Sequence, residues 1–283
     1  MASATMRRMK KTLAGTVALL SMLALASVAS AQDVTITNAR IIVGNGQVIE
    51  RGSIVARGGK IVSVGTQPAP AGGRTIDGAG MTAIAGFIDG HRHINTGPNE
   101  KAQMQALLEA GYTTILSGGG PADGNLTLRD HIEKGVINGP RIIPSGQVRL
   151  NQTPADARAQ VQALAKLGVK YTGEIALTPK PGPTPQELEV LRAIVDEGNK
   201  ANVVVQVHAV SPQAMMAAVD AGVKHLVHTP HFGWFSLEDG KKTAAAGVKQ
   251  LSTIGFGVPV FGDRKSTRLN SSHVSESRMP SSA

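Results

Sequence analysis

The sequence predicts an α/β fold, in which a small β domain precedes an incomplete (β/α)8 barrel of the TIM type. The chain has 283 residues, of which 41% are hydrophobic, and this is enough to bury a substantial core. Strand patterns interrupted by glycines fill the first part, and after Gly86 strand patterns alternate with helix patterns. Six or seven strand–helix units in one run favour a barrel over an open sheet. A complete barrel needs about 250 residues, so we expect this one to be unfinished.

Residues 1–31 have the composition of an export signal. Basic residues open the chain, an uncharged apolar run extends from Leu13 to Val28, and Ala29-Ser30-Ala31 supplies a small-residue cleavage site. A transmembrane anchor is the alternative, but the run is short for a bilayer and ends in small residues. We therefore expect a periplasmic or secreted protein that has no membrane attachment after cleavage.

The formal net charge of +9 does not predict a nucleic-acid partner. Most of the excess lies near the two ends of the chain, in Arg7, Arg8, Lys10, Lys11, Arg264, Lys265, Arg268 and Arg278. Only 3% of residues are aromatic, so the stacking surfaces of single-strand binders are missing. The absence of cysteine excludes a thiolate nucleophile and a zinc–thiolate site. A small-molecule substrate is the expected partner, and an oligomer is possible.

Residues 32–85 are expected to form a small, β-sandwich-like domain. The strand candidates are VTITNARIIV, VIERGSIVARGG and KIVSVG, with Gly44-Asn45-Gly46 and Gly58-Gly59 as the turns between them. Gly44 and Gly46 are also compatible with a dinucleotide-binding loop. A hairpin is the better account, because no third glycine and no helix follow.

Residues 86–262 are expected to form the partial barrel. The strand candidates are FIDGHRHI, YTTILS, RIIPSGQV, KYTGEIAL, VVVQVHAV, HLVH and VKQLSTI. Three helices have readable starts, where a hydroxyl residue precedes a proline: Thr153-Pro154, Thr184-Pro185 and Ser211-Pro212. Glu187 completes a capping box with Thr184.

Residues 263–283 differ abruptly in composition from the chain before them and show no hydrophobic period. Their sequence resembles the translation of a widely used short-read sequencing adapter. A natural, disordered, serine-rich tail is the alternative. We expect an artefact, and so a natural chain that is interrupted near Gly262.

His91 and His93 are the first candidates for chemistry. They lie two residues apart on a predicted strand, so both imidazoles face the same side. By itself a His-x-His pair is weak evidence and is compatible with surface or core histidines. Here the pair ends the first barrel strand, at the rim where barrel enzymes carry their catalytic groups.

The segment GFIDGHRHI resembles the first-strand metal motif of the amidohydrolase superfamily. The resemblance covers roughly Val34 to Gly262 and is closest to the imidazolonepropionase-like and prolidase-like branch. It implies that the first-strand histidines bind one divalent metal, that a strand-four carboxylate or carboxylated lysine bridges to a second, and that histidines on strands five and six complete the site.

Carried over to this chain, the resemblance implies His208 and His228 as the ligands of strands five and six. Strand four departs from the pattern, because KYTGEIAL has Glu174 where many relatives carry the lysine. A carboxylate offers equivalent anionic oxygens. A solvent-facing or salt-bridged glutamate is the alternative reading. His231 and Lys180, in the loops after strands six and four, are candidate substrate contacts, and each is also compatible with a solvated surface residue.

Four imidazoles and one carboxylate suit zinc better than magnesium or calcium, so two zinc ions are the expected cofactors. They would activate water for hydrolysis of an amide-type C–N bond in a dipeptide, a cyclic amide or an acylated amino acid. Lactone or phosphotriester hydrolysis, and an exported binding protein with a degenerate site, are the alternatives. The family's catalytic aspartate belongs to strand eight, which this sequence lacks. No catalytic residue is therefore assigned, and the 283-residue chain itself is expected to be inactive.

Overall fold

The computed structural model of this protein describes residues 33–67, 72–94 and 96–253. The expected export signal, the tail from residue 263 and the last residues of the predicted barrel lie outside the described residues. The chain divides into two compact units, Met1–Ala85 and Gly86–Ala283.

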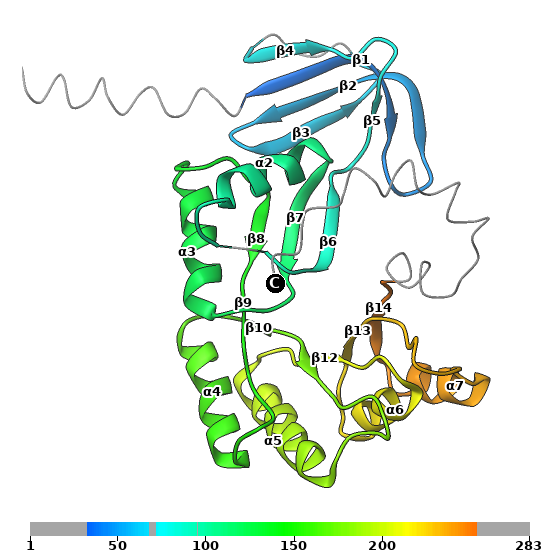
Figure 1. The fold of residues 1–283 in the computed structure, drawn as a ribbon. Helices are drawn as coiled ribbons and strands as arrows, with labels where there is room; N and C mark the ends of the chain where they lie inside the picture. Colours follow the sequence, from blue (N-terminus) through cyan, green and yellow to red (C-terminus); the bar gives the residue numbers. More distant parts are fainter. Residues whose placement is uncertain (1–32, 68–71, 95, 254–283) are drawn as a thin grey trace, which may run out of the picture. The chain divides into compact units, whose positions relative to one another are not determined.

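The first unit contains a five-stranded sheet (Figure 1). Its strands are β1 (Val34–Ile42), β2 (Val48–Arg57), β3 (Lys60–Gly65), β4 (Arg74–Asp77) and β5 (Thr82–Ala83). They are arranged in the order β3-β2-β1-β4, and β5 also pairs with β1. The pairs β1–β2 and β2–β3 are antiparallel. Both predicted glycine turns join them, and Gly44 and Gly59 have φ values of 94° and 73°, which suit glycine alone without strain.

The second unit is an α/β domain, as the sequence predicts. Its strands are β6 (Phe87–Arg92), β7 (Tyr112–Ser117), β8 (Arg141–Ile143), β9 (Ser145–Gly146), β10 (Tyr171–Thr172), β11 (Ile175–Ala176), β12 (Gln206–His208), β13 (His225–Val227) and β14 (Lys249–Leu251). Its helices are α2 (Glu100–Glu109), α3 (Ala122–Glu133), α4 (Pro154–Lys166), α5 (Pro185–Ala201), α6 (Pro212–Asp220) and α7 (Leu237–Ala245). Each strand pairing in this unit is parallel.

Two of the seven predicted barrel strands are interrupted. RIIPSGQV divides into β8 and β9 at Pro144, which has no N–H to give to a neighbouring strand. KYTGEIAL divides into β10 and β11 around Gly173 and Glu174. As a result, β8 pairs with β7, whereas β9 pairs with β10 and β11 pairs with β12. Breaks of this kind redirect side chains near functional sites.

The strands curve strongly between β6 and β14. The Leu251 side chain in β14 lies so close to Gly90 in β6 that a Cβ on Gly90 would be 2.9 Å from Leu251 Cδ2. An open sheet would separate its first and last strands by several spacings of about 4.8 Å each. The arrangement is therefore of the barrel type, with α3 to α7 following the strands on their outer side (Figure 1).

The main core of this unit lies between the strands and these helices. Val207 of β12, Leu191 and Ile194 of α5 and Met215 of α6 are fully buried in it. The three predicted helix starts are confirmed, since Thr153, Thr184 and Ser211 each accept a hydrogen bond from a backbone N–H of the first turn. Among the described residues, we find no helix with the length and apolar character needed to span a bilayer.

The predicted capping box at the start of α5 also holds a loop at the barrel rim. Glu187 accepts hydrogen bonds from the Thr184 N–H at 2.7 Å, the Thr178 N–H at 3.1 Å and the Thr178 hydroxyl at 2.9 Å. Partial burial alone would raise the pKa of Glu187, but these hydrogen bonds outweigh burial and lower the pKa. An ionised Glu187 thus fixes both ends of segment 178–184.

We predict that Glu187→Gln destabilises the fold at neutral pH by about 1 kcal/mol, the usual size of a capping interaction. Because the folded-state pKa lies below the unfolded one, the stabilisation is present above the unfolded pKa and is lost as pH falls through the folded pKa. Urea unfolding at several pH values measures the difference, with Glu189→Gln on the same helix as the control. Equal stability of the two variants at pH 7 would contradict the prediction.

Candidate metal centre

The structure brings together all five residues that the sequence singles out as metal ligands. His91 lies in β6 and His93 directly after it, Glu174 lies in the break between β10 and β11, His208 ends β12, and His228 follows β13. Each residue is thus at the carboxyl end of a parallel strand, the position that barrel enzymes use for chemistry.

Glu174 is the centre of this cluster. Its Oε1 lies 2.9 Å from His93 Nε2, and its Oε2 lies 2.9 Å from both His208 Nδ1 and His228 Nε2. His91 Nε2 is 3.2 Å from the same Oε2. The prediction that His91 and His93 face the same side is confirmed, because both reach one carboxylate.

The geometry leaves one imidazole without a satisfactory partner. The His91 side chain is only 4% exposed, and its Nδ1 and Nε2 make no hydrogen bond with any described residue, since the approach to Glu174 is poorly aligned. Three nitrogens also surround Glu174 Oε2, which has lone pairs for about two. Buried polar groups without partners are uncommon, and such atoms are typical of a site that binds an ion.

The donor atoms form two groups of the kind that hold a metal ion. His91, His93 and Glu174 make one group and Glu174, His208 and His228 make the other, with the ligand atoms in each group within 4.8 Å of one another. Ligands about 2.0–2.1 Å from a tetrahedral zinc ion lie about 3.3 Å apart, close to the nitrogen–oxygen distances around Glu174. Glu174 belongs to both groups, so its carboxylate is shared between the two candidate sites.

The electrostatics keep Glu174 in its anionic form. Burial by itself would raise its pKa, but hydrogen bonds from His208 and His228, together with the nearby His91 and His93, hold the pKa well below its ordinary value. The hydrogen bond to Glu174 in turn raises the pKa of His93, against the opposing effect of burial. An ionised carboxylate is the form that binds a metal.

Glycines after β7 make room for the first-strand imidazoles. A Cβ on Gly118 would lie 2.9 Å from His91 Cε1, closer than real Cβ atoms approach. A Cβ on Gly119 would lie 3.5 Å from His93 Cε1, an ordinary contact. The Gly118 carbonyl also accepts a hydrogen bond from the Glu174 N–H at 2.8 Å. Gly118 therefore contacts both the first-strand histidine His91 and the backbone of Glu174.

Two positions that support the ligands, Gly118 and Thr253, are not among those predicted from the sequence. Gly118 belongs to the run Gly118-Gly119-Gly120 at the end of a predicted strand, and such a run is a usable signal for close approach. Thr253, whose Oγ1 is 2.8 Å from His228 Nδ1, carries no signal in the sequence. The contact between Thr253 and His228 arises only because β14 pairs with β13.

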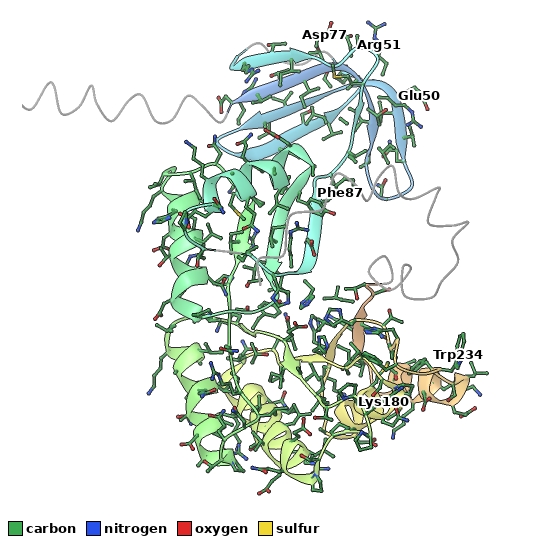
Figure 2. The ribbon with its side chains drawn as sticks, in the orientation of Figure 1. Glu50, Arg51, Asp77, Phe87, Lys180 and Trp234 are labelled. Atoms are coloured by element: carbon green, nitrogen blue, oxygen red, sulfur yellow. The ribbon has the colours of Figure 1, made fainter. Side chains whose placement is uncertain are left out.

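His231 and Lys180 lie together but outside the ligand cluster. The rings of His231 and Phe232 are 4.7 Å apart between centroids, and Lys180 Nζ lies 5.8 Å from the centre of the Phe232 ring. The backbone N–H groups of His231 and Phe232 both donate to Val210, two residues after His208. The loops that follow strands four, five and six are therefore in contact with one another. Figure 2 shows Lys180 on this part of the unit, together with Trp234, which is 94% exposed.

Two other histidines lie outside both ligand groups. His131 in α3 contacts Glu100, with 2.7 Å between Nδ1 and Oε1. The ring of His225 contacts that of Tyr171 of β10, with 6.4 Å between centroids. Burial lowers the pKa of His225. Both histidines therefore have contacts of their own outside the ligand cluster.

We predict that Gly118→Ala weakens zinc binding by about ten- to a hundredfold, the usual effect of disturbing the groups that support metal ligands. The added methyl group must displace the buried His91 ring. Competition with a chromogenic chelator measures the affinity, and Gly119→Ala is the matched control because its methyl group meets only an ordinary contact. Equal zinc affinities for the two variants would show that Gly118 does not position His91.

Comparison with known proteins agrees with this geometry. Residues 82–250 match the amidohydrolase family. An N-acyl-D-aspartate deacylase from Alcaligenes xylosoxydans xylosoxydans is 33% identical over 86 residues, which are 30% of this chain and 17% of the deacylase. A putative prolidase from Bifidobacterium longum is 28% identical, with a TM-score of 0.62 over 75% of this chain and 57% of that one.

A Xaa-Pro dipeptidase with bound methionine in its active site shows the same fold. It is 22% identical, with a TM-score of 0.66 over 80% of this chain and 68% of the dipeptidase. The chain thus spans 57% of the putative prolidase and a much smaller share of the deacylase. The family match covers more than half of the chain and includes all five candidate ligands. The chain therefore belongs to the amidohydrolase family, and it has a TIM-barrel-type fold.

Proposed function

We propose that this protein is a metal-dependent hydrolase that cleaves an amide-type C–N bond with a metal-activated water. The single observation that carries the proposal is the arrangement of two histidine pairs around one shared carboxylate, Glu174. Family membership supports hydrolysis as the reaction type.

In this proposal, His91, His93 and Glu174 hold one ion, and Glu174, His208 and His228 hold the other. Imidazole nitrogens with a carboxylate suit zinc, whereas calcium and magnesium prefer oxygen ligands throughout. When bound, two such ions activate a water and polarise the scissile carbonyl. The protein's part is to keep Glu174 ionised and to hold the four imidazoles at fixed positions around it.

The proposed substrate is a dipeptide, a cyclic amide or an acylated amino acid. The names of similar proteins support this class, since they include a deacylase, a dipeptidase and a D-hydantoinase. The loops after strands four to six supply Lys180 and His231 beside the aromatic ring of Phe232. We propose that Lys180 attracts a substrate carboxylate and that His231 contacts the polar part of the substrate.

Export to the periplasm or the medium is also a proposal, and it rests on the composition of residues 1–31. N-terminal sequencing of the secreted protein tests it, with cleavage after Ala31 as the expected result. The inactivity expected of the 283-residue chain stays a prediction, because it depends on the aspartate that the family carries on strand eight. Metal binding does not depend on that residue and gives the first test of the centre.

We predict that the purified protein binds about two zinc ions per chain, as expected of a two-metal site. Glu174→Ala removes the shared ligand and should leave less than one ion per chain, whereas Glu189→Gln, an exposed change on α5, should keep the wild-type content. Elemental analysis after dialysis against zinc measures the stoichiometry. An absence of stoichiometric zinc in the wild type would favour a binding protein with a degenerate site.

We predict that Lys180→Met weakens the binding of N-acyl amino acids to the zinc-loaded protein by about tenfold, the effect of losing one charge-assisted hydrogen bond. Binding of the matching uncharged amides should not change. Isothermal titration measures both ligands, and Lys166→Met at the end of α4 serves as the control. An equal loss for the acids and the amides would refute the carboxylate contact.

A further inference from the structure

His228 has an unusual backbone for a metal ligand at the end of a strand. Its φ is 73°, a left-handed conformation that is unfavourable for a residue with a Cβ. Such a conformation persists only where the surroundings hold it in place. It also interrupts the alternation of side-chain directions along β13. The direction of the His228 side chain therefore depends on the surrounding contacts and not on the strand period.

The segment that contains and follows β14 supplies these constraints. The Leu251 carbonyl accepts the His228 N–H at 3.0 Å, and the Gln250 side-chain amide donates to the His228 carbonyl at 3.0 Å. Thr253 Oγ1 lies 2.8 Å from His228 Nδ1. Three contacts from residues 250–253 therefore hold the backbone and the ring of His228, and Glu174 is the fourth contact.

The chemistry of the Thr253 contact depends on which nitrogen of His228 carries a proton. A neutral imidazole has one N–H and one lone pair, and the partner of one nitrogen fixes the role of the other. When Nε2 donates to Glu174, Nδ1 is an acceptor and the Thr253 hydroxyl can donate to it. When Nε2 binds an ion, Nδ1 carries the proton and the same hydroxyl can accept it.

We propose that Thr253 is a positioning residue that holds His228 in the same orientation with or without an ion at Nε2. This inference rests on the proposed metal function and adds a residue outside the ligand set. A hydroxyl suits the position because it donates and accepts, whereas an amide N–H or a carbonyl does only one of these. The second ion, bound by Glu174, His208 and His228, depends on this contact, and the ion at His91 and His93 does not.

A neighbouring hydroxyl offers a matched control. Thr229 Oγ1 lies 3.0 Å from Ser252 Oγ and links the ends of β13 and β14 without contacting the His228 ring. Replacing Thr229 by valine removes a hydroxyl from the same pair of strands and leaves the imidazole contact in place. It therefore reports the general effect of weakening this part of the fold.

The test is a zinc titration of wild type, Thr253→Val, Thr253→Ser and Thr229→Val against a chelator, which resolves the two binding steps. We expect Thr253→Val to weaken one step by about ten- to a hundredfold, with the other step unchanged. Thr253→Ser and Thr229→Val should match the wild type in both steps. Nitrogen-15 spectra of the zinc-loaded wild type should show His228 with its proton on Nδ1.

Two results would overturn the assignment. If Thr253→Val binds both ions as tightly as the wild type, Thr253 does not position His228. If Thr253→Ser is as weak as Thr253→Val, the loss reflects packing and not the hydroxyl. A wild-type protein that binds no zinc would instead refute the proposed metal centre, so the two failures are distinguishable.

Discussion

The carboxylate of Glu174, surrounded by imidazoles from three strands, is the interaction on which the arrangement of this domain depends. It lies where β10 and β11 separate, and its N–H donates to Gly118 and not to an adjacent strand in a regular ladder. The local break therefore aims the carboxylate at His91, His93, His208 and His228. In a continuous strand, the Glu174 N–H would make one more ladder hydrogen bond, but the strand would then fix the direction of the side chain.

This cluster would be costly as a purely structural feature. Side chains that are mostly buried lose hydration, and the loss must be balanced by well-formed hydrogen bonds or by ions. His91 has no aligned partner among the described residues, and Glu174 Oε2 is approached by more nitrogens than it can satisfy. A cation near each carboxylate oxygen would give His91 Nε2 a partner and would relieve the crowding of nitrogens at Oε2. The same atoms that make the apo cluster unfavourable are thus suited to bind metal.

Much of this organisation follows from the sequence, and the remainder depends on tertiary contacts. Strand period places His91 and His93 on one side, and hydroxyl–proline pairs mark the starts of α4, α5 and α6 because capping is a local interaction. The interruption at Glu174 is not local, since it depends on pairing with two different neighbours. The left-handed backbone of His228 and its contact with Thr253 likewise require β14 beside β13, which no short pattern encodes.

X-ray absorption spectroscopy of the zinc-loaded protein tests most directly whether Glu174 joins two ions. We expect nitrogen and oxygen ligands only, about two imidazoles per ion, and a metal–metal distance of about 3.5–4 Å that disappears in Glu174→Ala. A single isolated ion, or a metal–metal signal that persists without Glu174, would contradict the shared role of this carboxylate.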